Sequence, residues 1–343
     1  MEKKVNDALY GTRDKRGYWK PSNWPLRLSI YTQPTRPWVW LRFLFGFPGY
    51  LWPWQTVYFL ITLGVWYYLT PPLEMMRQFS VGWISFILAR NAGLVLLVYG
   101  TFHALLYIQR RQGTDFKYNI KWPDVGNPTF LFGNQTAENV FWTMCSGVPV
   151  LTAYEVLTWW LFANGYVPYV GFVEHPIYFF AILVLIPLWR ETHFYFIHRL
   201  IHVGPLYNII HKVHHNNVNP GPWSGLSMHT FEHIIYFTNV LIHFVVPSHP
   251  LHAIYELMNA ALSPAKTHVG FHKLVAVGEQ TIPSDNYFHY LHHKLFEVNY
   301  SDRTIPFDEW FGTAHDGSPE ADELLFKRLR ASKAKKHISA VSP

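Results

Sequence analysis

Long apolar stretches constrain this 343-residue chain more than any other feature of its sequence. Four of them cover residues 52–70, 81–108, 140–163 and 176–197. A helix needs roughly 20 apolar residues to cross the ~30 Å hydrocarbon core of a bilayer. Inside that core every backbone polar group must be satisfied within the chain, which leaves helices or closed barrels. The sequence therefore predicts an all-α integral membrane helical bundle of about four spans.

Two shorter apolar runs follow, at residues 234–246 and 251–262, with Pro247 and Pro250 between them. Neither is long enough to span comfortably, so we expect a re-entrant hairpin or a buried helix pair. The second long stretch contains Arg90 and Asn91, which need a partner or must face the protein interior, because unpaired polar groups are costly in a membrane.

Composition and charge narrow the class of protein. Half of the residues are hydrophobic and only 15% are charged, against roughly 25% in soluble domains. The single cysteine, Cys145, excludes an internal disulfide and is predicted to be a small packing residue. The net charge of +6 comes without a basic-aromatic recognition module, so anionic lipid headgroups are favoured over nucleic acid as a partner.

The basic residues also orient the chain. Counted before, between and after the four apolar stretches, Lys and Arg number nine, one, four, none and twelve. By the positive-inside rule, both termini and the histidine-rich region are predicted to face the cytoplasm. We expect a basic cytosolic or interfacial segment at 1–50, transmembrane helices at 51–197, a histidine-rich catalytic cap at 198–317, and a charged, solvated helical tail at 318–343.

Clustered histidines are the strongest functional signal. Of 20 histidines, 16 fall between His193 and His293. Four groups recur within that range as HxxxH, HxxHH, HxxxH and HxxHH. On a helix, positions i, i+3 and i+4 share one face, so the outer histidines of each group aim at one point, while the middle histidine of HxxHH can reach a neighbouring metal. The ten histidines of these groups are His198, His202, His211, His214, His215, His268, His272, His289, His292 and His293.

The number of imidazoles indicates two metal ions. One isolated i, i+4 histidine pair is more often structural than a ligand, but four such groups close together reverse that balance. A structural zinc ion needs only four ligands. Imidazole suits Zn, Cu, Fe and Ni alike, and a redox role favours iron.

These motifs resemble the fatty acid hydroxylase/sterol desaturase superfamily over residues 176–313. Tyr195–His202 is similar to that family's first histidine box, and His211–His215 to its second; Asn299 and Pro306–Thr313 resemble its closing motif. The resemblance implies a di-iron site formed by the ten histidines, with zinc as an alternative occupant in a purified sample. It also implies O2, a membrane lipid as substrate, and electrons from a reductase through cytochrome b5, ferredoxin or an equivalent donor.

Five further residues are predicted to support the ligands from just outside them. These are His193, Glu191, His229, Glu232 and Asn299. Thr230 stands where the family commonly has proline after the histidine at 229, and the role of His233 is open. Glu191 could instead form an ion pair with Arg190. Carboxylates near ligating imidazoles fix their tautomer and orientation.

The reaction and the setting stay open at this point. Hydroxylation is the simplest expectation, and desaturation on the same scaffold is the alternative. A histidine-rich membrane metal transporter and a catalytically inactive scaffold are the rivals from other classes. Sterols, fatty acyl chains, sphingoid bases, ether lipids and amino-lipid headgroups all remain as possible substrates. The membrane would be the endoplasmic reticulum in a eukaryote and the inner membrane in a bacterium.

Overall fold

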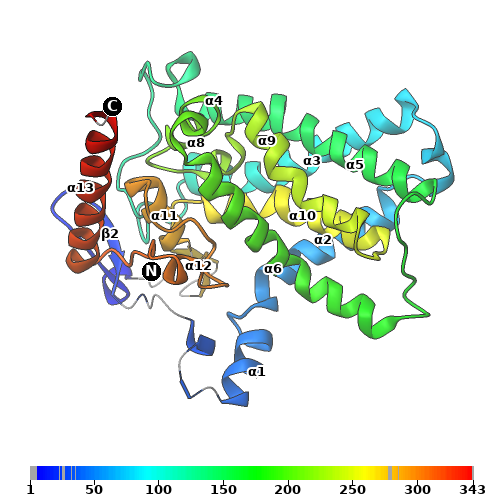
Figure 1. Ribbon diagram of the computed structural model, residues 1–343, viewed down its shortest axis with the longest axis horizontal. Helices are drawn as coiled ribbons and strands as arrows, with labels where there is room; N and C mark the ends of the chain where they lie inside the picture. The colour runs from blue at the N-terminus through cyan, green and yellow to red at the C-terminus, as the bar shows by residue number, and fades with distance from the viewer. Residues whose placement is uncertain are drawn as a thin grey trace.

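The computed structural model describes residues 6–22, 24, 28–31, 33–34, 36–276, 280–284 and 286–341, with side chains up to residue 331. The chain forms a helical bundle with a histidine-rich cap at one end (Figure 1). The lysines predicted to charge the tail beyond residue 331 lie outside the described side chains.

Three helical segments of the described chain are long and apolar enough to cross a membrane. The first is α3 (Val81–His103) with its wide last turn η5 (Ala104–Ile108). The second joins α4 (Gln135–Trp142), η7 (Thr143–Gly147) and α5 (Val148–Ala163). The third is α6 (Pro176–Ile201), which begins with proline in its first turn.

The predicted first span is shorter than expected. Helix α2 (Thr56–Tyr68) has 13 residues and follows the π-helical turn η3 (Leu51–Gln55), which contains Pro53. At 1.5 Å per residue it is about 20 Å long, so three of the four predicted spans are found among the described residues. The apolar run overestimated the helix mainly at its start, because the run from residue 52 to Gln55 lies in η3, where Trp52 has non-helical backbone angles and Pro53 lacks an N–H donor.

The two shorter runs form a buried helical hairpin at the centre of the bundle. The chain passes through α9 (Thr230–Tyr236) and η10 (Phe237–Phe244), turns, and returns as α10 (Pro250–Thr267). Every residue from Pro250 to Ala265 is buried, and α10 packs against α2, α3, α5 and α6. This confirms the predicted helix pair, and α10 leads from the distant end of the bundle to the cap.

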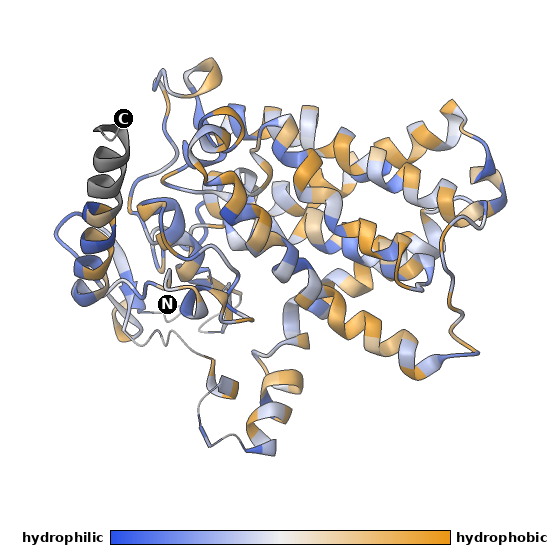
Figure 2. Ribbon diagram, in the orientation of Figure 1, coloured by the Kyte–Doolittle hydropathy of each residue, from blue (hydrophilic) through white to orange (hydrophobic). Residues whose placement is uncertain are grey.

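The outside of the bundle is apolar and its interior holds the charges. Figure 2 shows hydrophobic residues concentrated on the long helices and hydrophilic residues around the cap. Arg90 donates to Glu155 across the interior, and Asn91 donates to the same carboxylate at 2.9 Å. The predicted partner of Arg90 is therefore Glu155. Cys145, predicted to be a packing residue, is exposed on the outer face.

Most of the remaining elements are short and lie at the cap end of the molecule, except η4 (Leu73–Arg77) at the distant end of the bundle. They are η1 (Asp7–Leu9), β1 (Gly11–Arg13), β2 (Trp19–Pro21), η2 (Ser29–Tyr31), α1 (Pro37–Phe45), η6 (Leu131–Gly133), α7 (Gly204–Leu206), η8 (Tyr207–His211), α8 (Lys212–His215), η9 (Pro222–Leu226), β3 (Lys273–Val275), β4 (Thr281–Pro283), α11 (Tyr287–Leu295), α12 (Phe307–Trp310) and the longer α13 (Pro319–Val341). The antiparallel pairs β1–β2 and β3–β4 form two small hairpins. Trp19 of β2 packs with Tyr290 and Leu291 of α11, so the N-terminal hairpin braces the cap.

Candidate metal centre

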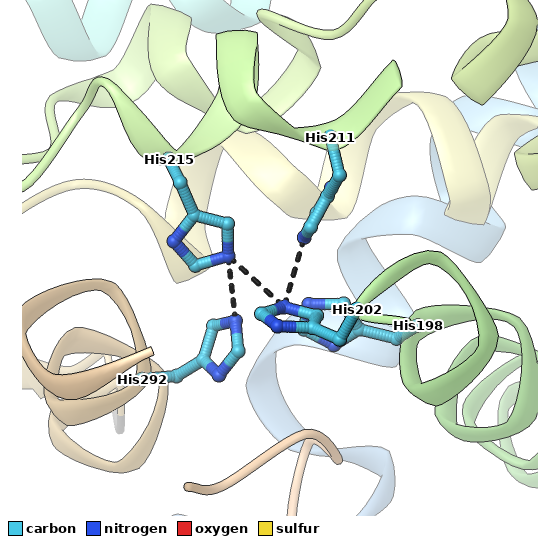
Figure 3. A group of neighbouring side chains, drawn as sticks. All are labelled: His198, His202, His211, His215 and His292. Carbon is cyan, nitrogen blue, oxygen red and sulfur yellow. Dashed lines mark hydrogen bonds between the residues drawn. The ribbon is translucent and has the colours of Figure 1, made fainter. Parts of the chain in front are cut away.

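The first histidine group gathers five side chains from three parts of the chain. His198 and His202 come from the end of α6, His211 and His215 from η8 and α8, and His292 from α11. Figure 3 shows the five imidazoles turned toward one another, with contacts linking His202, His211, His215 and His292. The Nε2 atom of His202 lies 3.1 Å from the Nε2 atoms of both His211 and His215.

The second group gathers four buried histidines. His214 comes from α8, His268 caps the end of α10, and His289 and His293 lie one turn apart on α11. The Nε2 atom of His268 lies 2.7 Å from that of His289 and 3.4 Å from that of His214. Each HxxHH motif therefore divides as predicted: its outer histidines join one group and its middle histidine joins the other.

These spacings match the edges of a coordination shell. Metal–imidazole bonds of ~2.0–2.1 Å at tetrahedral or octahedral angles separate ligand nitrogens by roughly 3.0–3.4 Å. The Nε2 atoms of His215 and His292 are 3.0 Å apart, and those of His289 and His293 are 3.2 Å apart. Both groups could therefore hold one metal ion each.

Backbone carbonyls fix the tautomer of three of these histidines. Nδ1 of His198 donates to the carbonyl of Tyr300 at 2.8 Å, that of His292 to Val298 at 2.6 Å, and that of His268 to Pro264 at 3.0 Å. A carbonyl oxygen can only accept, so the proton stays on Nδ1 and the lone pair of a neutral ring stays on Nε2. Nε2 of His198 is buried with no hydrogen-bond partner among the described residues. Converging lone pairs need a cation between them, so the donor set fits a metal.

Burial keeps the rings neutral, as metal binding requires. Burial lowers the pKa of His268 to about 4, and that of His202 to about 2 with a further contribution from the neighbouring His198 and Arg199. Burial also holds the pKa of His292 well below its ordinary value, and the neighbouring histidines lower it further. Burial therefore keeps these rings neutral at pH 7, the protonation state in which an imidazole can bind a metal ion.

Glu232 supports the first group directly. Its Oε1 atom accepts a hydrogen bond of 2.8 Å from Nδ1 of His211. Such a carboxylate orients the ring and makes its other nitrogen a stronger ligand. Glu232 is therefore placed where the sequence predicted a supporting residue.

The closing motif positions the two carbonyls that orient His198 and His292. Asn299 has a positive φ of 54°, and its side chain donates to the carbonyls of Phe288 and His315. Asp308 accepts from the backbone amides of Tyr300 and Ser301, both at 2.8 Å. This loop therefore acts on the metal centre through backbone atoms that a sequence motif does not reveal.

The tenth predicted histidine does not join either group. His272 packs against the rings of Trp19 and Trp24, and its Nδ1 atom lies 3.1 Å from the Tyr118 hydroxyl. The HxxxH spacing from His268 would align the two rings only on a helix. Helix α10 ends at Thr267, and Gly270 has a positive φ of 78°, so the chain turns away.

Three of the five predicted supporting residues lie elsewhere. His193 contacts the Thr238 hydroxyl at 2.8 Å, and His229 caps α9 by accepting from the Phe231 amide. Glu191 accepts from the Ile305 amide, and among the described residues its partners do not include a histidine of either group. These residues organise helix ends and loops instead of orienting candidate ligands.

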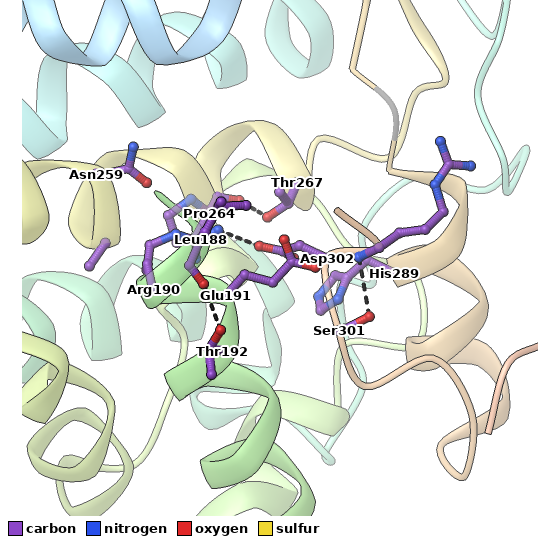
Figure 4. A network of polar contacts seen from close by, with 12 residues as sticks. Leu188, Arg190, Glu191, Thr192, Asn259, Pro264, Thr267, His289, Ser301 and Asp302 are labelled. Atoms are coloured by element: carbon purple, nitrogen blue, oxygen red, sulfur yellow. Dashed lines mark hydrogen bonds and ion pairs between the residues drawn. The ribbon is translucent and has the colours of Figure 1, made fainter. Parts of the chain in front are cut away.

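The partner of Arg190 is Asp302, a residue that the sequence did not single out. The Arg190 guanidinium donates to the Asp302 carboxylate, joining α6 to the loop after α11 (Figure 4). Asp302 follows the Asn299 motif closely in sequence, which is the one signal that could have drawn attention to it. Arg190 and Asp302 line both the small space between the histidine groups and a larger adjoining cavity.

Comparison with known proteins identifies the region that holds these groups. Residues 183–313 match the sequence model of the fatty acid hydroxylase family. Residues 183–313 resemble the fatty acid hydroxylase/sterol desaturase superfamily. The matched range runs from α6 to the closing motif and includes all nine gathered histidines, in agreement with the predicted resemblance.

Curated members of the superfamily are similar to this chain over less than half of its length. The Delta(7)-sterol-C5(6)-desaturase of Nicotiana tabacum is 29% identical over 174 residues, which cover 49% of this chain and 61% of the tobacco protein. A protein of Dictyostelium discoideum named as a methylsterol monooxygenase is 28% identical, covering 43% and 55%. The Delta(7)-sterol 5(6)-desaturase of Aspergillus fumigatus is 27% identical, covering 43% and 53%. The chain thus spans about half the length of these relatives, and no solved structure matches it significantly.

Proposed function

We propose that this membrane protein is an O2-dependent oxygenase that holds one iron ion in each histidine group and hydroxylates a membrane lipid. The observation that carries the proposal is the sorting of nine histidines, eight of them buried, into two groups of ligand spacing. The similarity of residues 183–313 to the fatty acid hydroxylase family, and of the chain to relatives named as a sterol desaturase and a methylsterol monooxygenase, supports the same reading. The five-histidine group would form one iron site and the four-histidine group the other.

The chain supplies geometry and a dry environment to the reaction. Bound iron would supply the O2-dependent oxidation of an unactivated C–H bond. The carbonyls of Val298 and Tyr300 hold protons on Nδ1 of His292 and His198, and Glu232 does so for His211. Because eight of the nine rings are buried, with His202 the exception, water is kept from the reacting centre.

The stoichiometry requires an external electron donor. Hydroxylation consumes one O2, two electrons and two protons; one oxygen atom enters the C–H bond and the other leaves as water. We propose cytochrome b5, a ferredoxin or an equivalent carrier as the donor, reduced by its own reductase. The carrier would dock on the cytoplasmic face, where we propose that the cap and both termini lie.

Contacts of the N-terminal segment support this orientation. Trp19 packs on His272, with ring centroids 5.2 Å apart, so residues before the first apolar run lie beside the cap. The N-terminal segment and the cap are both rich in basic residues, as expected for a cytoplasmic face.

Desaturation is the second candidate reaction. Two of the curated relatives are named as sterol desaturases. Desaturation uses the same O2 and two electrons, but removes two hydrogens from adjacent carbons and releases two waters. The product mass separates the reactions, because hydroxylation adds 16 mass units and desaturation removes two.

Expression in a host that lacks the enzyme, followed by untargeted lipid mass spectrometry, tests the proposal. A lipid shifted by +16 or −2 should appear with the wild-type chain and be absent with His211→Ala and His289→Ala. Unchanged product in both variants would contradict the oxygenase assignment. Metal flux in proteoliposomes without O2 consumption would favour a transporter instead.

A further inference from the structure

Two tyrosine side chains lie against the five-histidine group. The centroid of the Tyr300 ring lies 4.8 Å from that of His202 and 5.3 Å from that of His292. The centroid of the Tyr207 ring lies 5.6 Å from that of His202 on η8. Both phenols are therefore in ring contact with a candidate metal ligand.

The hydroxyl of Tyr300 has a proton acceptor in place. Tyr300 is only 3% exposed, and its hydroxyl donates to Oε2 of Glu297 at 3.0 Å. Glu297 itself is exposed, so its carboxylate is in contact with water. The hydroxyl of Tyr207 lies within the field of the same carboxylate, but among the described residues it makes no hydrogen bond to it. Tyr300 alone therefore joins a buried phenol beside the ligands to a base at the protein surface.

Packing alone does not require a hydroxyl group at this position. A phenylalanine ring would fill the same space, as Phe194 does beside His198, with ring centroids 4.7 Å apart. A phenol differs from a phenyl ring because it can give up one electron and one proton. Its O–H bond is also weaker than an unactivated C–H bond. A metal centre that oxidises the C–H bond of a lipid is therefore able to oxidise Tyr300.

The surroundings of Tyr300 favour loss of the proton together with the electron. The guanidinium of Arg199 lies 4.8 Å from the centre of the Tyr300 ring. A cation at this distance disfavours a positively charged ring by Coulomb repulsion. The neutral tyrosyl radical, which forms when the proton moves to Glu297, avoids that repulsion. The ring is also held in place, because the Tyr300 amide donates to Asp308 and its carbonyl accepts from His198.

We propose that Tyr300 is a redox-active residue that protects the metal centre when no lipid is bound. An oxidised centre without substrate takes one electron from Tyr300, and the phenol proton moves to Glu297. The products are a neutral tyrosyl radical and a centre reduced by one electron. One electron from the external carrier, with the proton returned by Glu297, restores the tyrosine. Without this donor the same oxidant would attack a ligand such as His202.

The inference rests on the proposed function, because O2 activation at the centre supplies the oxidant. Electron paramagnetic resonance of the purified full-length chain tests it without measuring turnover. The iron-loaded protein, in detergent and without lipid, is treated with hydrogen peroxide as the oxidant and frozen. A tyrosyl-radical signal should form in the wild type and be lost in Tyr300→Phe. Glu297→Gln should form the signal more slowly, because an amide is a far weaker base than a carboxylate.

Tyr207→Phe is the matched control. The Tyr207 ring also contacts His202, but its hydroxyl lacks the carboxylate hydrogen bond, so this variant should keep the signal. Wild-type protein loaded with zinc, which has no redox chemistry, should form no radical with peroxide. An equal signal in the zinc-loaded protein would overturn the proposal, because the oxidant would then not be the metal centre.

Iron content and histidine oxidation separate a redox role from a structural one. Tyr300→Phe keeps the ring, so its iron content and melting temperature should stay close to those of the wild type. Mass spectrometry after peroxide treatment should find more oxidised His202 in Tyr300→Phe than in the wild type or in Tyr207→Phe. The inference is wrong if iron-loaded wild type forms no radical, or if Tyr300→Phe keeps the full signal. Glu297→Gln leaves both tyrosines in place, so unchanged radical formation in that variant would likewise overturn the proton transfer.

Lipid products measured on the same preparations allow the two proposals to fail separately. A radical on Tyr300 without any lipid shifted by +16 or −2 would count against the proposed function alone. Such a product without a radical would count against the redox role of Tyr300 alone.

Discussion

His214 and His215 are consecutive residues whose imidazole rings belong to different histidine groups. Their ring centroids are 5.8 Å apart and the ring planes are perpendicular at 90°. His292 and His293 on α11 repeat the arrangement, at 5.9 Å and 83°. Adjacent positions on a helix point about 100° apart, so each HxxHH motif serves both groups. The two candidate metal sites are therefore linked through two short helices, and a change in either helix should disturb both.

Glu232→Gln tests the orienting hydrogen bond to His211. The amide keeps the shape of the side chain, but its oxygen is a weaker acceptor for the Nδ1 proton of His211 than a carboxyl group that can ionise when the metal binds. We expect a 10- to 100-fold loss in iron affinity or activity, measured by metal titration of the apo-protein. Glu174→Gln, in an exposed loop, is the control and should bind iron normally. Wild-type affinity in Glu232→Gln would show that the carboxylate does not act on the site.

Asp308→Ala tests the loop that presents the Val298 and Tyr300 carbonyls. The change leaves two buried backbone amides without acceptors, which should cost about 2–6 kcal/mol of unfolding free energy. Iron content should fall as well, because His198 and His292 lose their orientation. Asp14 also accepts from two backbone amides but is exposed. Water can replace it, so Asp14→Ala should leave the melting temperature and the iron content nearly unchanged.

Variants of Arg90 and Glu155 test how much an unpaired buried charge lowers the free energy of unfolding. Both side chains are almost fully buried, so Arg90→Met alone should destabilise the protein by about 3–5 kcal/mol, since it strands the carboxylate. Arg90→Met combined with Glu155→Leu should recover most of that loss. Denaturation in mixed detergent micelles measures both. Additive losses in the double variant would show that the two charges do not act as a pair.

Acidification should release iron and destabilise the protein over a defined range. His268 has a pKa of about 4 when folded and titrates near ~6.5 when unfolded. Between these values the unfolded chain binds more protons, so stability is complete above about pH 6.5 and falls as the pH drops toward 4. Protons also compete with the metal for the same nitrogens. Iron content and melting temperature measured from pH 8 to 4 should decline together; a flat profile would contradict buried neutral ligands.

The sequence predicted the bundle and the convergence of histidines because both depend on local spacing. Apolar runs gave three spans and the buried helix pair, and the HxxHH motifs correctly divided their histidines between two centres. The prediction that His272 joins His268 in a ligand group was wrong, because a glycine turn, not a helix, follows His268. The prediction of a span from the first apolar run was wrong because its first residues form η3, with a non-helical Trp52, and α2 has only 13 residues.

Contacts between distant segments could not be predicted from spacing. Arg190 pairs with Asp302, 112 positions away, instead of its neighbour Glu191. The carbonyls that orient His198 and His292 belong to the backbone, which carries no residue-specific signal.

Iron stoichiometry in single histidine variants tests the central claim most directly. Wild-type protein should hold two iron ions per chain. His211→Ala and His289→Ala should each hold about one, because they break different groups, and the double variant should hold none. His272→Ala, a histidine of the same motif series outside both groups, should keep two. Two ions in both single variants, or loss of iron in His272→Ala equal to theirs, would contradict the two-group metal centre.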